Sequence, residues 1–203
     1  MPVDPVPSNP PSGPSLGRFE RLALTWKAKA LLLFSLRARA DGVFKDILRR
    51  SPQDVYALSS LAYAALQRGD HTLAHRYFEQ VRDLTPQVSN AQFNLAFVAE
   101  LLGRLDEAEA GFREALAIEE KMDRAWYGLG IVLVRQGRLP EALIALRRNT
   151  SLQPMSPFGW YQIARLHVAL QQPDEARAVI RHLSGFEPKV AAQLERETGL
   201  RPV

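Results

Sequence analysis

A spacing of 34 residues recurs along the sequence, and it constrains the fold more than any other feature. The residues that keep this step include Ala74, Ala108, Ala142 and Ala176, and also Leu61, Leu95, Leu129 and Ile163. A period of this length is typical of repeats that stack into one continuous solenoid and do not form separate globular domains. The aligned columns predict four repeats, 55–88, 89–122, 123–156 and 157–190.

Each repeat carries the patterns of two helices. In the repeat 123–156, Trp126, Leu129 and Leu133 fall at helical spacing, and Gly137 then suits the left-handed residue that ends a helix. Pro140 fits the first turn of a second helix, where a missing N–H costs no intrahelical hydrogen bond. Small residues recur on both helices, and they predict close helix packing: Ala62, Ala96, Gly130 and Ala164 on the first, and Ala74, Ala108, Ala142 and Ala176 on the second.

These patterns resemble the tetratricopeptide repeat. The resemblance is carried by "AQFNLAFVAELLGRLDEAEAGFREAL" (91–116), by "AWYGLG" and "GRLPEA" within 125–154, and by "GWYQIARLHVALQQPDEA" (159–176). It implies an all-α fold, a right-handed α-solenoid of helix-turn-helix repeats. Three residues depart from the repeated columns, and we expect them to loosen individual helix ends: Asn149, Glu120 in place of a proline, and Gln171 in place of a glycine.

The two ends of the chain depart from the repeat pattern. Residues 1–17 hold six prolines and no lysine or arginine, so we expect disorder there and no signal peptide. Residues 18–54 resemble a divergent basic repeat, because Ala40 and Phe44 keep the 34-residue step while Lys27 stands in the Leu61 column. Residues 191–203 are predicted to hold a capping helix and a tail, with Val190 and Leu194 turned inward.

Positive charge is concentrated near the start of the chain. The formal net charge is +4, and residues 18–50 alone contribute nine basic and three acidic residues, which is +6. A basic helix over 18–39 next to "LLLF" (31–34) offers an alternative function, a membrane-peripheral scaffold. A helical wheel of 18–39 does not separate charged from apolar residues, so a packed end repeat is the favoured interpretation. No basic stripe with interleaved aromatics continues along the repeats, which argues against nucleic-acid binding.

Catalytic chemistry is not indicated. The chain has no cysteine, which excludes thiol catalysis, disulfides and thiolate metal sites. His71, His75 and Glu79 share helical spacing, but zinc would need a fourth ligand, and a solvated outer face is the favoured interpretation. Glu107, Glu141 and Glu175 recur with the period, as expected for charges that stabilise helix N-termini. We therefore predict a non-enzymatic protein with no cofactor and no metal.

The resemblance implies that the first helices line a groove that holds a peptide segment of a partner protein. The partner-binding residues that it implies are Tyr56, Tyr63, Asn90, Phe93, Asn94, Phe97, Leu101, Arg124, Tyr127, Ile131, Val134, Arg135, Phe158, Tyr161 and Arg165. Tyr63, Phe97 and Ile131 share one column, so we expect an apolar strip that accepts apolar anchors. Arg124, Arg135 and Arg165 favour acidic groups on the ligand.

Some co-chaperones of this family grip a C-terminal carboxylate with a clamp of lysine, asparagine, asparagine, lysine and arginine. The best register here places Ser59, Tyr63, Asn94, Arg124 and Gly128 at those positions. Only Asn94 and a lysine-to-arginine change agree, which argues against that clamp. The sequence therefore predicts a cytoplasmic adaptor or assembly factor that binds another protein through a segment with apolar anchors and acidic groups.

Overall fold

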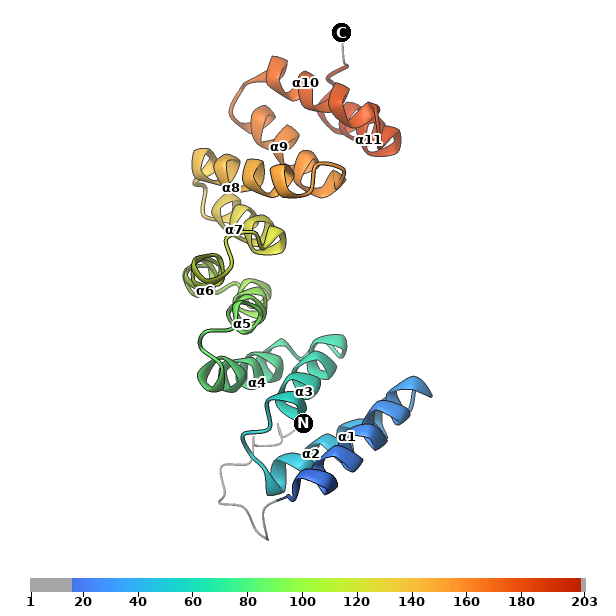
Figure 1. Cartoon of the computed structure of the whole chain (residues 1–203). Helices are drawn as coiled ribbons and strands as arrows, with labels where there is room; N and C mark the ends of the chain where they lie inside the picture. The colour runs from blue at the N-terminus through green and yellow to red at the C-terminus, as the bar shows by residue number, and fades with distance from the viewer. Residues whose placement is uncertain (1–15, 202–203) are drawn as a thin grey trace. The chain divides into compact units, whose positions relative to one another are not determined.

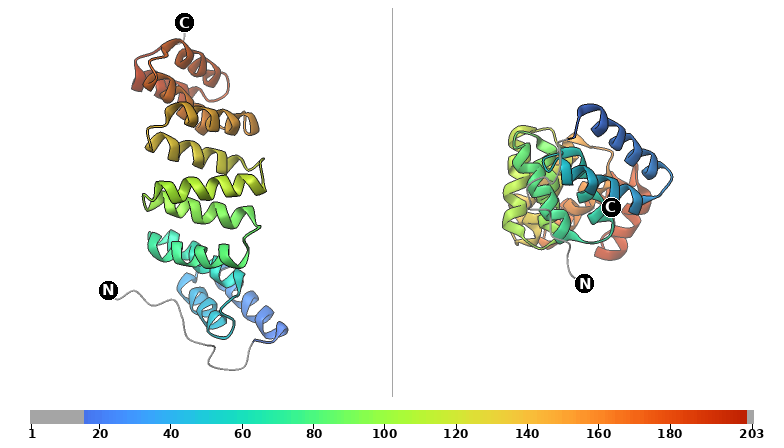
Figure 2. Two further views of the ribbon diagram at one scale, coloured as in Figure 1. Left: turned by 90° about the vertical axis from the view of Figure 1, so that its left-hand side faces the viewer. Right: turned by 90° about the horizontal axis from the view of Figure 1, so that it is seen from below.

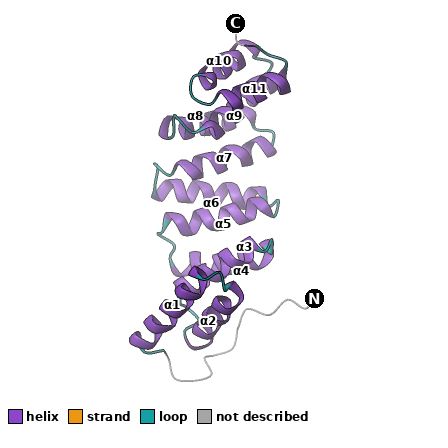
Figure 3. Ribbon diagram, turned by 90° about the vertical axis from the view of Figure 1, so that its right-hand side faces the viewer, coloured by secondary structure: helices purple, strands orange, loops and turns teal. Residues whose placement is uncertain are grey.

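The computed structural model describes residues 16–201, and within that range it consists of eleven α-helices without a strand (Figures 1 and 3). The helices divide into two compact units at Leu102 and Gly103, inside the predicted repeat 89–122. The segment 1–17, for which disorder was predicted, lies outside the described residues apart from Leu16 and Gly17.

Unit 1 holds five helices, α1 (Arg18–Leu33), α2 (Arg37–Arg50), α3 (Val55–Gln67), α4 (His71–Leu84) and α5 (Ser89–Leu101). Each packs against the next one along the chain, and neighbours run in alternating directions (Figure 2). Two of the helices begin at an aspartate cap, because the side chain of Asp54 accepts a hydrogen bond from the N–H of Ala57 and that of Asp70 accepts one from Leu73.

The prediction of one helix over 18–39 is wrong. α1 ends at Leu33, and Ser35 has a φ of 59°, a left-handed conformation that side-chain-bearing residues adopt at a cost. The chain then turns back and α2 begins at Arg37. α1 nevertheless keeps the small-residue column of the repeats, because Ala28 stands 34 residues before Ala62 and is fully buried.

Unit 2 holds six helices, α6 (Leu105–Ile118), α7 (Asp123–Arg135), α8 (Leu139–Leu152), α9 (Pro157–Ala169), α10 (Pro173–Ser184) and α11 (Pro188–Thr198). α8, α9, α10 and α11 each have a proline in the first turn. Small residues bring α7 and α8 together, since a Cβ on Gly130 would lie 2.6 Å from Cγ of Leu146. In α11 the buried residues are Ala191 and Leu194, while Val190 is only half-buried.

The departures at Glu120 and Gln171 do not loosen the helix ends. Gln171 has a φ of 58° and keeps the left-handed turn that Gly137 makes at 77°. The next residue, Gln172, still donates its backbone N–H to the carbonyl of His167 at 2.8 Å. At Glu120 the backbone carbonyl accepts a hydrogen bond from Nε1 of Trp126 at 2.8 Å, as the carbonyl of Pro154 does from Trp160.

The departure at Asn149 is matched by a second one. Asn149 is buried in α8, and its Nδ2 donates to the carbonyl of Asp123 at 2.9 Å, which ties α8 to the start of α7. A Cβ on Gly159 would overlap Oδ1 of Asn149, and it would lie 2.8 Å from Cγ2 of Thr150. Because Gly159 has no side chain, it leaves room for the Asn149 side chain. The expected loosening of a helix end is therefore wrong at Asn149 too.

Candidate functional site

In unit 1 the predicted groove residues of α3 and α5 meet around Tyr63. The Tyr63 ring is about half exposed and packs edge-on against Phe78, with 5.2 Å between the ring centroids. Its hydroxyl accepts a hydrogen bond from Nδ2 of Asn94 at 2.9 Å. This bond joins α3 to α5 and fixes the orientation of the Tyr63 ring.

Apolar side chains continue from Asn94 along α5. Phe93 and Phe97 stack nearly parallel, with an interplanar angle of 9° and 6.3 Å between centroids. Phe97 is 39% exposed and Leu101, one turn further, is 40% exposed. We call Tyr63, Phe93, Asn94, Phe97 and Leu101 the α3–α5 face. The α3–α5 face exposes several apolar side chains and one amide to solvent. This composition suits the apolar anchor residues of a ligand.

Two further predicted residues of unit 1 lie at its margins. Tyr56 packs edge-on against Phe44 of α2 at 5.8 Å, and the ammonium group of Lys29 lies 5.1 Å above its ring. The Tyr56 ring is therefore in contact with side chains of α1 and α2. Asn90 is exposed at the first turn of α5.

In unit 2 the predicted groove residues lie on α7 and α9. The half-buried members are Tyr127, Ile131, Val134 and Tyr161, and the exposed ones are Arg124, Arg135, Phe158 and Arg165. Compared with the α3–α5 face, this set carries more positive charge. The predicted strip of Tyr63, Phe97 and Ile131 has two members in unit 1 and one in unit 2, so its continuity stays a prediction.

The C-terminal helix occupies part of this unit 2 set. The hydroxyl of Tyr161 donates a hydrogen bond to Oε2 of Glu197 on α11 at 2.6 Å, and Nε2 of Gln193 donates to Oε1 at 2.7 Å. The guanidinium of Arg165 lies 5.7 Å from the centroid of the Tyr161 ring. The bond from Tyr161 lowers the pKa of Glu197, and the same bond raises the pKa of Tyr161. α11 thus supplies a carboxylate where an acidic ligand group was expected.

Comparison with known proteins identifies the repeats. Models described as tetratricopeptide repeat match residues 27–74 and 60–122, 103–157, and 161–182. The chain belongs to the tetratricopeptide-repeat family. No curated protein sequence matches it.

Solved structures show the tetratricopeptide fold at low sequence identity. MamA from Desulfovibrio magneticus RS-1 (residue 41 to the end) is 18% identical with a TM-score of 0.75, over 90% of this chain and 98% of that chain. YrrB, a TPR protein with an unusual peptide-binding site, is 16% identical with a TM-score of 0.74, over 87% and 92%. PilW, a type IV pilus biogenesis factor, is 19% identical with a TM-score of 0.72, over 90% and 93%. The chain therefore has the all-α tetratricopeptide solenoid fold.

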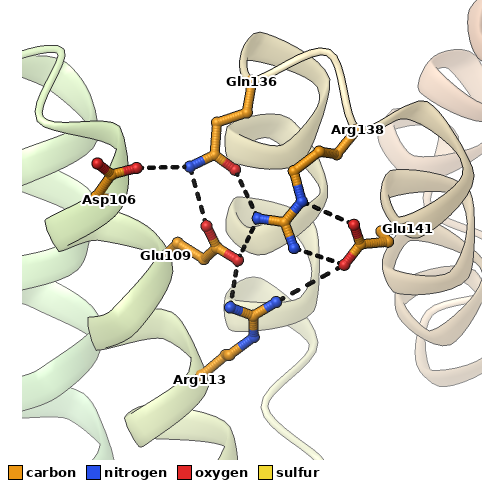
Figure 4. A network of polar contacts seen from close by, with 6 residues as sticks. All are labelled: Asp106, Glu109, Arg113, Gln136, Arg138 and Glu141. Carbon is orange, nitrogen blue, oxygen red and sulfur yellow. Dashed lines mark hydrogen bonds and ion pairs between the residues drawn. The ribbon is translucent and has the colours of Figure 1, made fainter.

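A polar network in unit 2 of this tetratricopeptide chain was not predicted. Glu109 of α6 is buried and accepts hydrogen bonds from Gln136 at 2.9 Å and from Arg138 at 2.6 Å, and Arg113 also pairs with it (Figure 4). Arg138 makes two further bonds to Glu141, at 2.6 and 2.7 Å. The network joins α6, the end of α7 and the start of α8. It left no periodic signal, because Glu109 has no counterpart in the other repeats.

The protonation states of the network agree with a structural role. Burial raises the pKa of Glu109, but hydrogen bonds from Gln136 and Arg138 and the charge of Arg113 outweigh it and leave the pKa below its usual range. The bond from Arg138 lowers the pKa of Glu141 as well. Both carboxylates stay ionised near neutral pH, which does not suit a general acid, and their lowered pKa values make them weak general bases. Glu141 was predicted only as a charge at a helix N-terminus, and the ion pair adds to that role.

An open cleft of about 610 Å³ lies between α8, α9 and α10 and was also missed. Trp160, His167 and His182 are among its lining residues. The ring centroids of Trp160 and His182 lie 4.4 Å apart. Ala178, which stands one period after Ile144, also lines the cleft. The predicted groove residues all came from first helices, whereas this cleft is lined by α9 together with two second helices, α8 and α10.

The histidine pair of α4 is not on a solvated face. His75 is buried, His71 is half-buried and only Glu79 is exposed, so the predicted outer face is wrong for His75. Between residues 16 and 201, no cluster of three histidine, aspartate or glutamate side chains has the geometry to hold a metal ion. Over the same range, no helix is both long and apolar enough to span a membrane.

Proposed function

We propose that this tetratricopeptide-repeat chain is a non-enzymatic adaptor or assembly factor that binds a peptide segment of another protein. The observation that carries the proposal is the α3–α5 face, where Tyr63, Phe97 and Leu101 expose apolar surface that the repeat does not need for its own packing. Exposed apolar groups of this kind are typical of surfaces that bind anchors of a partner.

The geometry supports a preformed site. The Asn94 bond fixes Tyr63 on one side, and the stacked Phe93 ring supports Phe97 on the other. Side chains that are already ordered lose little conformational entropy when a ligand binds. YrrB, which shares the fold, is a TPR protein with an unusual peptide-binding site, and PilW is a biogenesis factor of type IV pili. Both agree with a protein partner for this chain.

The charge of the unit 2 set suggests a preference for acidic groups on the ligand. Arg124, Arg135 and Arg165 are exposed on α7 and α9, and they favour a segment with acidic residues besides its apolar anchors. An acidic group at Arg165 would have to share the site with Glu197 of α11. Such charges mainly change the association rate and its salt dependence, whereas the apolar anchors set the affinity.

A peptide library displayed on phage tests the proposal. Peptides selected on the immobilised full chain are titrated into the chain and into Phe97→Ala, with helical content followed by circular dichroism. We expect Phe97→Ala to weaken binding at least about tenfold, because truncating a buried anchor costs about 2 kcal/mol or more. Ile144→Ala is the matched control, because Ile144 is an exposed apolar residue of α8, outside the proposed face. Binding that survives Phe97→Ala and is lost in Ile144→Ala would contradict the proposal.

A further inference from the structure

α1 has two apolar faces on opposite sides of one helix. The inner face contains Ala28, which is fully buried, and Leu24 and Leu31, which pack against the core of unit 1. This face lies against α2, which runs along one side of α1 (Figure 1). The second face has no role in this packing.

The outer face is a stripe of large apolar side chains. Phe19 is 90% exposed, Leu22 55%, Trp26 63% and Leu33 81%. Steps of three, four and seven residues place all four within about 60° on a helix of 3.6 residues per turn. We call these four residues the outer stripe. Phe34, the C-cap residue of α1, is 72% exposed as well.

The outer stripe explains why the helical wheel of 18–39 did not separate charged from apolar residues. That wheel continued past the end of α1 at Leu33, and it looked for one apolar face where the helix has two. Lysines and arginines lie in the two bands between these faces, each about 120° wide, so charged and apolar residues alternate around the helix. The structure separates them, because it shows which apolar residues are buried and which are exposed.

The acidic residues near α1 are already paired. Glu20 pairs with Arg50, whose Nη2 donates to Oε2 at 2.8 Å. Asp54, which caps α3, lies 3.7 Å from Nη1 of Arg21. These contacts link α1 to α2 and to the cap of α3, and they pair Glu20, the one acidic residue of α1.

Three other basic residues of α1 flank the outer stripe. On a wheel of about 100° per residue, Lys29 and Arg18 lie about 20° and 40° outside one edge of the outer stripe, and Lys27 lies about 80° outside the other edge. The ammonium group of Lys29 lies 5.3 Å from the Trp26 ring, which places positive charge directly beside the stripe. Within the part of unit 1 that the structure describes, none of these three residues forms an ion pair. Their charge is available to an anionic surface.

We propose that α1 lies on the surface of an anionic lipid bilayer, with the outer stripe inserted at the level of the headgroups. Phenylalanine, tryptophan and leucine on one face with lysine and arginine beside them is the composition of helices that bind in this interface. Tryptophan in particular favours that depth. A helix of 16 residues is about 24 Å long, too short to cross the hydrocarbon core, so it lies along the surface.

A second copy of the chain fits the outer stripe less well. Trp26 is at the middle of the stripe, so antiparallel pairing of two copies would set Trp26 against Trp26. Lys27 and Lys29 of one copy would then face the same lysines of the other, and like charges so placed repel. Anionic headgroups offer the opposite charge along both edges. This membrane contact is independent of the peptide site proposed for the α3–α5 face.

Vesicle sedimentation of the full chain tests the apolar contribution. The probes are vesicles of phosphatidylcholine alone and vesicles with 30% phosphatidylglycerol. We expect binding to the anionic vesicles, and a loss of at least about tenfold in partition for Trp26→Gln. Ile144→Gln is the matched control, because Ile144 of α8 is about as exposed as Trp26, and it should bind as the parent does. Equal binding of Trp26→Gln and the parent would overturn the proposal.

The charges are tested on the same vesicles. Lys27→Glu should lower the partition coefficient about fivefold or more, since each basic residue near an anionic surface is worth about 1 kcal/mol. Lys121→Glu, in the exposed turn after α6, should have a much smaller effect. Binding should weaken from 50 to 500 mM salt. Failure to bind anionic vesicles, with a dimer in sedimentation equilibrium that Trp26→Gln dissociates, would assign the stripe to a second copy. A soluble protein captured in place of lipid would also contradict the proposal.

Discussion

Tyr63 of unit 1 and Tyr161 of unit 2 lie on first helices, and each uses its hydroxyl differently. Tyr63 accepts a hydrogen bond from the neutral Asn94, and the face around it remains open to water. Tyr161 donates to the charged Glu197, and α11 takes the place beside it. The same helical repeat therefore presents a surface in one unit and holds a terminal helix in the other. The difference lies in α11, which follows the last repeat, and in the side chains that contact it.

The largest expected effect concerns the buried alanine column that the second helices of both units share. Ala74 of α4 and Ala142 of α8 stand two periods apart and are both fully buried. An arginine at either position would overfill a close helix contact and bury a charge, so we expect Ala74→Arg and Ala142→Arg each to destabilise by about 3 kcal/mol or more. For a chain of this length that lowers the melting temperature by about 6 to 12 °C.

Calorimetry or circular dichroism measures these shifts. Ala110→Arg, at an exposed position of α6, is the matched control and should stay within about 0.5 kcal/mol of the parent. A melting temperature unchanged in Ala142→Arg but lowered in Ala74→Arg would show that the two units do not use this column in the same way.

The second prediction concerns a place where the units differ. Gly159 of α9 stands two periods after Ala91 of α5, and it faces the buried Asn149. We expect Gly159→Ala to destabilise unit 2 by about 1 to 2 kcal/mol, because the overlap with Asn149 outweighs the better helix propensity of alanine.

A double-mutant cycle checks this compensation. Asn149→Ala removes the overlapping Oδ1, so Gly159→Ala should cost less in that background than in the parent chain. Chemical denaturation supplies the four free energies of unfolding. If the two substitutions are simply additive, Gly159 and Asn149 do not compensate for each other.

The sequence predicted those parts of the structure that repeat. Periodic small residues such as Ala142 and turn glycines such as Gly137 report the helix pairs and their close packing, because each repeat meets the same steric demands. Features that occur once were missed. The end of α1 depends on a left-handed serine, Ser35, which no sequence rule singles out, and Gly159 compensates for Asn149 through a contact between neighbouring helices.

The candidate surfaces follow the same division. Column arithmetic predicted Tyr63 and Phe97 as groove residues because the first helices repeat, and both are exposed. It could not find that Glu197 of α11 reaches Tyr161, because α11 follows the last repeat and its contacts have no period. The outer stripe of α1 required knowing which side of the helix α2 covers. Non-periodic contacts at the two ends of the chain are thus where the structure adds most.

The smallest expected effect tests the difference between the two tyrosines directly. The bond from Tyr161 lowers the pKa of Glu197 in the folded chain, so this contact contributes to stability above the pKa of the unfolded state. The contribution is lost as the pH falls through the lowered pKa. Tyr161→Phe removes the donor, and we expect the pKa of Glu197 to rise toward its ordinary value. Tyr63→Phe is the matched control, because the bond between Tyr63 and Asn94 involves no carboxylate. A pH titration of the Glu197 carboxyl carbon by NMR measures all three chains. If Tyr161→Phe leaves the pKa of Glu197 unchanged, α11 is not held by this bond, and the face of α9 is as open as the α3–α5 face.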